Sequence, residues 1–207
     1  MFLGIMAWDK LLLFTGGELL FSLSPGLTVV MISAYGFKGG FRAALAAICG
    51  TQTANAIWFV LCALGLGAVV TASPMAFAVL RYLGAAYLIW LGGTALWHSR
   101  KPMSEVAERK LRANPYIQAV LTQLGNPKAL LFFGAFVPQF LDTSAPLLPQ
   151  YLLMFAITFL GESIILSGYG WLAAVGGKRT ATHHAVWRER ISGTVLVGLG
   201  LLFALRS

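Results

Sequence analysis

Apolar runs long enough to cross a bilayer alternate with short polar links along the whole chain. A spanning helix needs ~20 mostly apolar residues. Six stretches meet that need, at residues 11–34, 43–70, 75–97, 117–139, 148–175 and 191–206, of which the last is the shortest. The pattern predicts an all-α integral membrane protein with six transmembrane helices, forming a single transmembrane transporter domain over residues 1–207.

The two halves of this pattern resemble each other. Ser24-Pro25-Gly26 interrupts the first predicted helix at the same relative place as Asn126-Pro127-Lys128 in the fourth. Halves at about residues 8–97 and 116–206 would each hold three helices and therefore lie in opposite orientations in the bilayer. The sequence thus predicts a 3+3 inverted repeat with broken helices 1 and 4, whose breaks face one another near the midplane.

Composition and charge place this bundle in a membrane. Hydrophobic residues make up 58% of the chain and charged residues 11%, which is too apolar for a soluble domain. The net charge is +8, but 11 of the 15 Lys and Arg lie in three links, near residues 36–42, 98–116 and 176–190. By the positive-inside rule these links, including the long one at 98–115, face the cytoplasm and both termini lie outside it. No nucleic-acid partner is expected.

The break in the fourth helix carries a charge. Pro127 removes a backbone donor and frees carbonyl groups, and Lys128 adds a cation within an apolar run. A charge at the centre of a bilayer costs ~2.5–3.5 kcal/mol, so it usually faces a partner, a cavity or a transport path. Asn126, Pro127 and Lys128 are therefore predicted to bind substrate; the alternative is that Lys128 extends to an interface.

The break in the first helix has hydroxyl groups beside it. Ser22 and Ser24 precede Pro25 and Gly26, and a kink there would free backbone groups to bind a ligand. The alternative is a kink whose freed groups are satisfied by neighbouring helices. We predict that Pro25 and Gly26 contact substrate because a second break, at Pro127, has the same relative position.

An acidic residue lies midway along the fifth predicted helix. A buried carboxyl group near a cation can be poised to exchange a proton during transport, which makes Glu162 the predicted proton-coupling residue and Lys128 its partner. A static ion pair and a protonated structural acid are the alternatives. Tyr169 lies two turns further along the same face and is a hydroxyl ligand or a packing residue.

Other polar side chains are open to two readings. Asn55, with Gln52, Thr51 and Thr53, forms a polar patch in the second helix that either contacts substrate or holds helices together. Glu18 is expected nearer the outer face, in a gating, interfacial or structural role.

The sequence offers little support for an enzyme or a metal site. Cys49 and Cys62 are expected to pack, and His183 and His184 to be solvated in a link, so no metal site is predicted. The chain has no phosphate-binding GxxxxGK[ST], HExxH or GxSxG motif, and neither an enzyme nor a cofactor is expected.

Two long segments resemble the lysine exporter and homoserine/threonine resistance (LysE/RhtB) family of bacterial efflux proteins. They run from Ser73-Pro74 to Leu91-Gly92 and from Leu121 through Asn126-Pro127-Lys128 to Gln139-Phe140, and the early Pro-Gly break adds to the likeness. The resemblance implies an inner-membrane exporter of amino acids or related small metabolites, driven by the proton gradient.

The chain departs from the family pattern at two places. The usual Pro-Gly-Pro-Asn/Asp is Pro25-Gly26-Leu27-Thr28, which leaves Thr28 as the substrate-binding candidate there, and Asn55 stands where many members carry an acid. Both changes favour Glu162 as the proton-linked group. Metal-cation export, as of cadmium, and a structural protein without transport are the alternatives. A homodimer through Gly84, Gly92 and Gly93 is a further expectation.

Overall fold

The computed structural model describes residues 6–24, 26–72 and 114–176, with single positions between 75 and 93, at 111 and between 194 and 201. Their regular elements are helices: α1 (Trp8–Leu23), α2 (Leu27–Ala72), α4 (Pro115–Leu124), α5 (Pro127–Leu131) and α6 (Leu147–Gly176). The predicted third and sixth helices lie very largely outside the described residues. The all-helical membrane fold is confirmed in outline, and the 3+3 arrangement of six helices stays a prediction.

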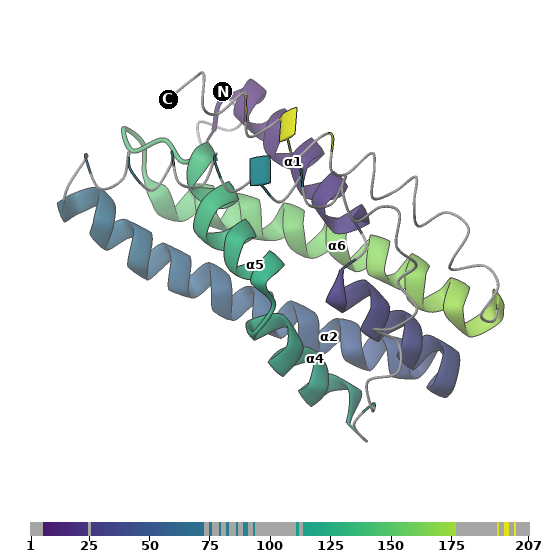
Figure 1. The fold of residues 1–207 in the computed structure, drawn as a ribbon. Helices are drawn as coiled ribbons and strands as arrows, with labels where there is room; N and C mark the ends of the chain where they lie inside the picture. Colours follow the sequence, from purple (N-terminus) through teal and green to yellow (C-terminus); the bar gives the residue numbers. More distant parts are fainter. Residues whose placement is uncertain are drawn as a thin grey trace.

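Helix α2 contains a reversal of the chain. Gly40 has φ 71°, a left-handed conformation that glycine adopts without strain, and the residues on either side are helical. Figure 1 shows the chain turning back there. The apolar stretch Leu27–Gly65 has 39 residues, about 58 Å if straight, so it could not lie within one ~30 Å bilayer crossing. The predicted link at residues 36–42 is shorter in the structure. The backbone is helical through the basic residue Lys38 and turns at Gly40.

The predicted break of the fourth helix is present. Helices α4 and α5 are bent by 49° across Gly125 and Asn126. Each begins with an Asn-Pro pair: the side chain of Asn114 accepts from the Ile117 N–H at 3.2 Å, and that of Asn126 accepts from the Lys128 N–H at 3.0 Å. Asparagine caps the free N–H groups, and proline at the first helical position loses no bond, so the break is encoded locally.

Helix α5 continues through a π-helical turn, Phe132–Phe136, and a 3₁₀ turn, Val137–Phe140. These turns carry phenylalanines that pack against α1. The ring of Phe14 lies 5.7 Å from that of Phe136 and 5.2 Å from that of Phe140, and the ring of Phe21 lies 5.0 Å from that of Phe132. This aromatic cluster fixes α1 against the second half of the broken helix.

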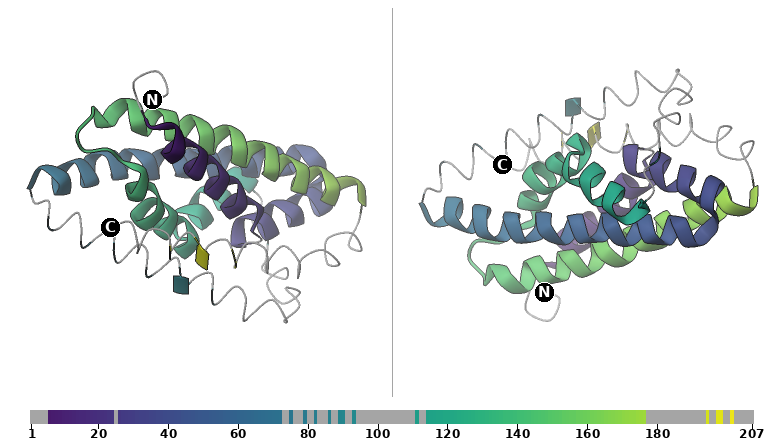
Figure 2. Two further views of the ribbon diagram at one scale, coloured as in Figure 1. Left: turned by 90° about the horizontal axis from the view of Figure 1, so that it is seen from above. Right: turned by 90° about the horizontal axis from the view of Figure 1, so that it is seen from below.

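The long helices form the frame of the molecule. Helix α2 packs against α6 and α4, and α1 packs against α6, as the two views of Figure 2 show. Over the described residues, α6 and the segment Leu27–Gly65 are long and apolar enough to span a membrane, and the bent pair Pro115–Leu124 with Pro127–Phe140 makes a third candidate. Of the glycines expected at a homodimer contact, Gly84 and Gly92 lie outside the described residues, and a Cβ at Gly93 would meet no atom within 4 Å.

The link before α6 is tied down by polar contacts. Gln150 is fully buried, accepts from the Asp142 N–H at 2.8 Å and donates to the Asp142 carbonyl at 2.9 Å. The N–H and hydroxyl of Ser144 donate to the Asp142 carboxylate, which holds the pKa of that carboxyl below its usual range. Lys10 of α1 lies 4.0 Å from the same carboxylate.

Candidate functional site

The two helix breaks meet through Lys128. Its ammonium group donates to the carbonyl oxygens of Phe21 at 2.6 Å and Ser24 at 2.8 Å, and it lies 4.5 Å from the centre of the Phe21 ring. Carbonyls at the C-terminal end of a helix lack intrahelical partners and attract cations. A Cβ at Gly26 would lie 3.4 Å from Lys128 Cδ, an ordinary contact distance, so the lysine side chain passes beside the first break. Pro25 lies outside the described residues.

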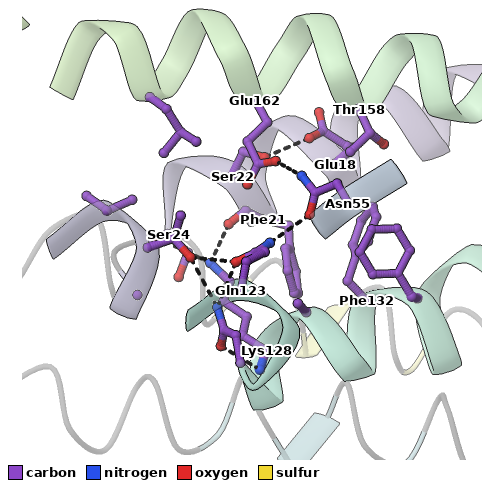
Figure 3. Close-up of a pocket in the computed structure, with 17 residues that line it drawn as sticks. Glu18, Phe21, Ser22, Ser24, Asn55, Gln123, Lys128, Phe132, Thr158 and Glu162 are labelled. Carbon is purple, nitrogen blue, oxygen red and sulfur yellow. Dashed lines mark hydrogen bonds between the residues drawn. The ribbon is translucent and has the colours of Figure 1, made fainter. Parts of the chain in front are cut away.

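A chain of amides joins the broken helix to Glu162. Asn126 Nδ2 donates to Gln123 Oε1 at 3.2 Å, Gln123 Nε2 donates to Asn55 Oδ1 at 2.8 Å, and Asn55 Nδ2 donates to a Glu162 carboxylate oxygen. Figure 3 shows Gln123, Asn55 and Glu162 in this order between α4, α2 and α6. Every donor in the chain points toward Glu162. The chain therefore runs in one direction, from the break to the carboxylate.

Thr28 ties the first half of the molecule into the same network. Its hydroxyl donates to Gln123 Oε1 at 2.7 Å and accepts from Asn126 Nδ2 at 3.2 Å. Thr28, Asn55, Gln123 and Asn126 are each at most 7% exposed, so the network is shielded from the surroundings. Gln123 is its centre, since it bonds to the other three.

A second carboxylate faces the cavity beside Glu162. Glu18 is 1% exposed, and its Oε1 accepts from the Ser22 hydroxyl at 2.6 Å. Glu162 also accepts from Gln52 Nε2 at 3.4 Å. The sequence predicts Glu18 nearer the outer face, but its side chain belongs to the same buried cluster as Glu162 and Lys128, because the Glu18 face of α1 packs against α6.

These groups surround a cavity of about 40 Å³, which has room for a few water molecules. Phenylalanines 21, 132 and 133 supply apolar walls, and the polar lining comes from Glu18, Ser22, Ser24, Thr28, Asn55, Gln123, Asn126, Lys128, Thr158 and Glu162. Cationic, anionic and amide groups are thus gathered around one cavity between apolar helices.

Most of the predicted site residues come together here, and two stand apart. Gly26, Thr28, Asn55, Asn126, Lys128 and Glu162 line the cavity. Pro127 is exposed and starts α5 without lining it. Tyr169 also lies off the lining, where its hydroxyl donates to the Leu23 carbonyl at 3.0 Å, at the end of α1.

Lys128 and Glu162 share the cavity without touching. Within the part of the chain that the structure describes, no carboxylate oxygen lies within 4 Å of Lys128 Nζ, and the ion pair found there is Lys10 with Asp142. The same part contains no group of three or more His, Cys, Asp and Glu residues suited to a metal ion. The Lys128 ammonium group and the carboxylates of Glu18 and Glu162 therefore line one cavity without forming an ion pair.

Gln123 is a site residue that sequence reasoning missed, and Glu18 is one that it expected nearer the outer face. Gln123 lies one helical turn before Asn126, and Glu18 lies one turn before Ser22 and two turns before the first break. In each case a polar residue shares a helix face with a predicted break, and that spacing is the signal that indicates them.

Comparison with known proteins gives one family. A family model described as LysE type translocator matches residues 19–207. The chain is 36% identical over 156 residues to a homoserine/homoserine lactone efflux protein of Salmonella typhimurium, covering 74% of this chain and 75% of the relative. A leucine efflux protein of Enterobacter sp. is 33% identical over 131 residues, 62% of each chain.

A third relative covers more of the chain but its name carries no activity. It is an uncharacterized membrane protein of Vibrio cholerae, 35% identical over 187 residues, covering 89% of this chain and 91% of the relative. No solved structure matches the chain.

Proposed function

Because the chain belongs to the LysE type translocator family, we propose that it exports an amino acid or a related small metabolite across the bacterial inner membrane in exchange for protons. Relatives named for homoserine and leucine efflux support an amino-acid substrate. The observation that carries the proposal is the cavity, which holds a lysine and two carboxylates within membrane-spanning helices. A zwitterion is the small molecule that such a charge distribution fits.

The lysine end of the cavity would take the carboxylate. An ammonium group has three donors, and Lys128 uses two of them on the Phe21 and Ser24 carbonyls. Its third N–H can bind a carboxylate oxygen, with the Asn126 amide beside it. Gly26 and Thr28 of the first break would contact the same end of the substrate.

Glu162 would couple protons to this binding. When ionised it accepts the amide donors that lead back to Asn126. A protonated Glu162 keeps one oxygen as an acceptor but loses its negative charge and gains an O–H donor, so the bond from Asn55 would weaken and the bonds from Asn55 through Gln123 to Asn126 would readjust. Protonation at α6 would in this way alter the hydrogen bonds at the broken helix, where the carboxylate binds.

Glu162→Gln tests the coupling. The glutamine keeps an acceptor for Asn55, so the fold and counterflow of labelled leucine or homoserine should be retained. Its amide group does not titrate, so acceleration of export by an imposed pH gradient should be lost. The assay uses proteoliposomes loaded with an amino-acid mixture and mass spectrometry of the released molecules.

The outcomes of this assay separate the alternatives. Export by Glu162→Gln that still responds to the gradient would reject Glu162 as the coupling residue. If the wild-type protein releases no amino acid faster than empty liposomes, the amino-acid proposal fails, and cadmium and other cations are tested next. A structural protein without transport predicts that the double variant Glu162→Gln, Lys128→Met folds and leaves every flux unchanged.

The orientation of the chain is a further part of the proposal. The link at 141–147 has no Lys or Arg and the link at 98–115 is basic, which supports placing them outside and inside the cytoplasm, with both termini outside. In a variant lacking Cys49 and Cys62, Ser144→Cys should react with a membrane-impermeant maleimide in whole cells, and Ser104→Cys only after lysis. The reverse result would invert the topology.

A further inference from the structure

Two buried polar atoms in the cavity have no hydrogen-bond partner among the residues that the structure describes. They are Glu18 Oε2 and Thr158 Oγ1, in side chains that are 1% and 4% exposed. A buried polar atom left unpaired is costly, and most such atoms in folded proteins are satisfied. Both side chains line the cavity (Figure 3), so the unpaired atoms indicate where a ligand binds.

The surrounding contacts leave Glu18 Oε2 available. The Ser22 hydroxyl occupies Oε1 and fixes the carboxylate. A Cβ at Gly161 would lie 2.8 Å from Oε2, so glycine in α6 is what admits the carboxylate against that helix. Thr158 and Glu162 are one turn apart on α6 and share a face. Glu18 of α1 and Thr158 and Glu162 of α6 thus bring oxygen atoms to one end of the cavity. Lys128 instead binds the Phe21 and Ser24 carbonyls at the helix breaks.

We propose that Glu18 and Thr158, which lie beside Glu162, bind the α-ammonium group of the substrate. The inference rests on the proposed function and deepens it. A primary ammonium has three N–H donors and no acceptor, which suits carboxylate and hydroxyl oxygens. The substrate would then lie with its ammonium toward α1 and α6 and its carboxylate toward Lys128. The class of substrate follows: amino acids with a free ammonium are transported, and their N-acetyl derivatives and α-hydroxy analogues are poor substrates.

The test compares how strongly analogues with and without a free ammonium group compete with the substrate. Counterflow of labelled leucine and homoserine is inhibited with each unlabelled amino acid, its N-acetyl derivative and its α-hydroxy analogue. The wild type should prefer the amino acids by at least about tenfold, the scale of one hydrogen bond to a charged group. Glu18→Gln should lower that preference about tenfold, and Thr158→Val should lower it by a smaller factor.

Thr15→Val is the matched control for Thr158→Val. Thr15 lies on α1, does not line the cavity, and its hydroxyl bonds to the Leu11 carbonyl at 2.8 Å. The same β-branched replacement there should leave discrimination unchanged. Monodispersity in detergent and thermal unfolding check that each variant is folded.

Several outcomes would overturn the inference. Unchanged discrimination in both folded cavity variants would reject it while leaving amino-acid export intact. Should neither variant fold, wild-type competition by N-acetylleucine as strong as by leucine would reject it as well. A sodium requirement that Glu18→Gln abolishes, with discrimination intact, would assign the subsite to an inorganic cation. A wild type that moves no amino acid would overturn this inference and the proposed function together.

Discussion

Lys128→Met is expected to reduce export strongly and to weaken the contact between the two helix breaks. Loss of a charge-assisted bond to the substrate carboxylate costs ~1.5–3 kcal/mol, so export should fall about 100-fold. Methionine also leaves the Ser24 carbonyl without its donor, and Phe21 O would keep only the 3.2 Å bond from Ser24 N–H. One buried carbonyl left unpaired destabilises by ~1–3 kcal/mol. Export from proteoliposomes and thermal unfolding in detergent measure the two effects.

Lys10→Met is the matched control. Lys10 lies on α1 and pairs with the Asp142 carboxylate at 4.0 Å, with about a third of its side chain exposed. Exposed pairs are worth ~0–1 kcal/mol, so this variant should export normally and unfold at nearly the wild-type temperature. Wild-type export by Lys128→Met would show that the lysine serves only to cap the carbonyls of α1.

Gly50→Ala is expected to produce the largest loss of stability. The added Cβ would overlap the Tyr116 carbonyl oxygen of α4 and lie 3.0 Å from the Ala119 Cβ. A backbone atom cannot rotate away as a side chain can, so α2 and α4 must separate. Overpacking of this kind costs ~1–3 kcal/mol. Since Gln123 lies two turns beyond Tyr116 on α4, the shift should also weaken its bond to Asn55 and reduce export.

Gly65→Ala provides the comparison on the same helix. A Cβ at Gly65 would meet no atom of the described residues within 4 Å, and alanine is the better helix former by ~1 kcal/mol. Thermal unfolding should therefore separate the two variants clearly, with Gly65→Ala at or above the wild type. Equal unfolding temperatures for both variants would contradict the close approach of α2 and α4.

Small residues hold the other main helix contact as well. A Cβ at Gly36 would lie 2.5 Å from the Gly170 carbonyl oxygen, and one at Gly170 would lie 2.7 Å from the Ala44 Cβ. In a membrane, lipid competes equally for apolar side chains, so helices gain by close backbone approach. These glycines thus set the distance between α2 and α6, and with it the width of the cavity.

The sequence by itself determined the features that depend on local chemistry. Apolar length predicts the spanning helices, and the Asn-Pro pair at Asn126 predicts the break that the structure contains. It also pointed to Lys128, Asn55 and Glu162, since a polar residue deep in an apolar run is costly wherever it lies. Helix ends were predicted less well. The basic residues near Gly40 suggested a link at 36–42, whereas the structure has a turn at Gly40 between helical residues.

Only the tertiary structure decided which polar groups meet. Thr28 and Gln123 are 95 positions apart, and Lys128 binds backbone carbonyls, which every residue has and no sequence pattern marks. The helices are apolar on the lipid side and the core side alike, so hydrophobic periodicity does not show how each is rotated. Helix rotation and close glycine contacts brought Glu18 into the cavity with Glu162, and they determined that Gln123 joins the break to the carboxylate.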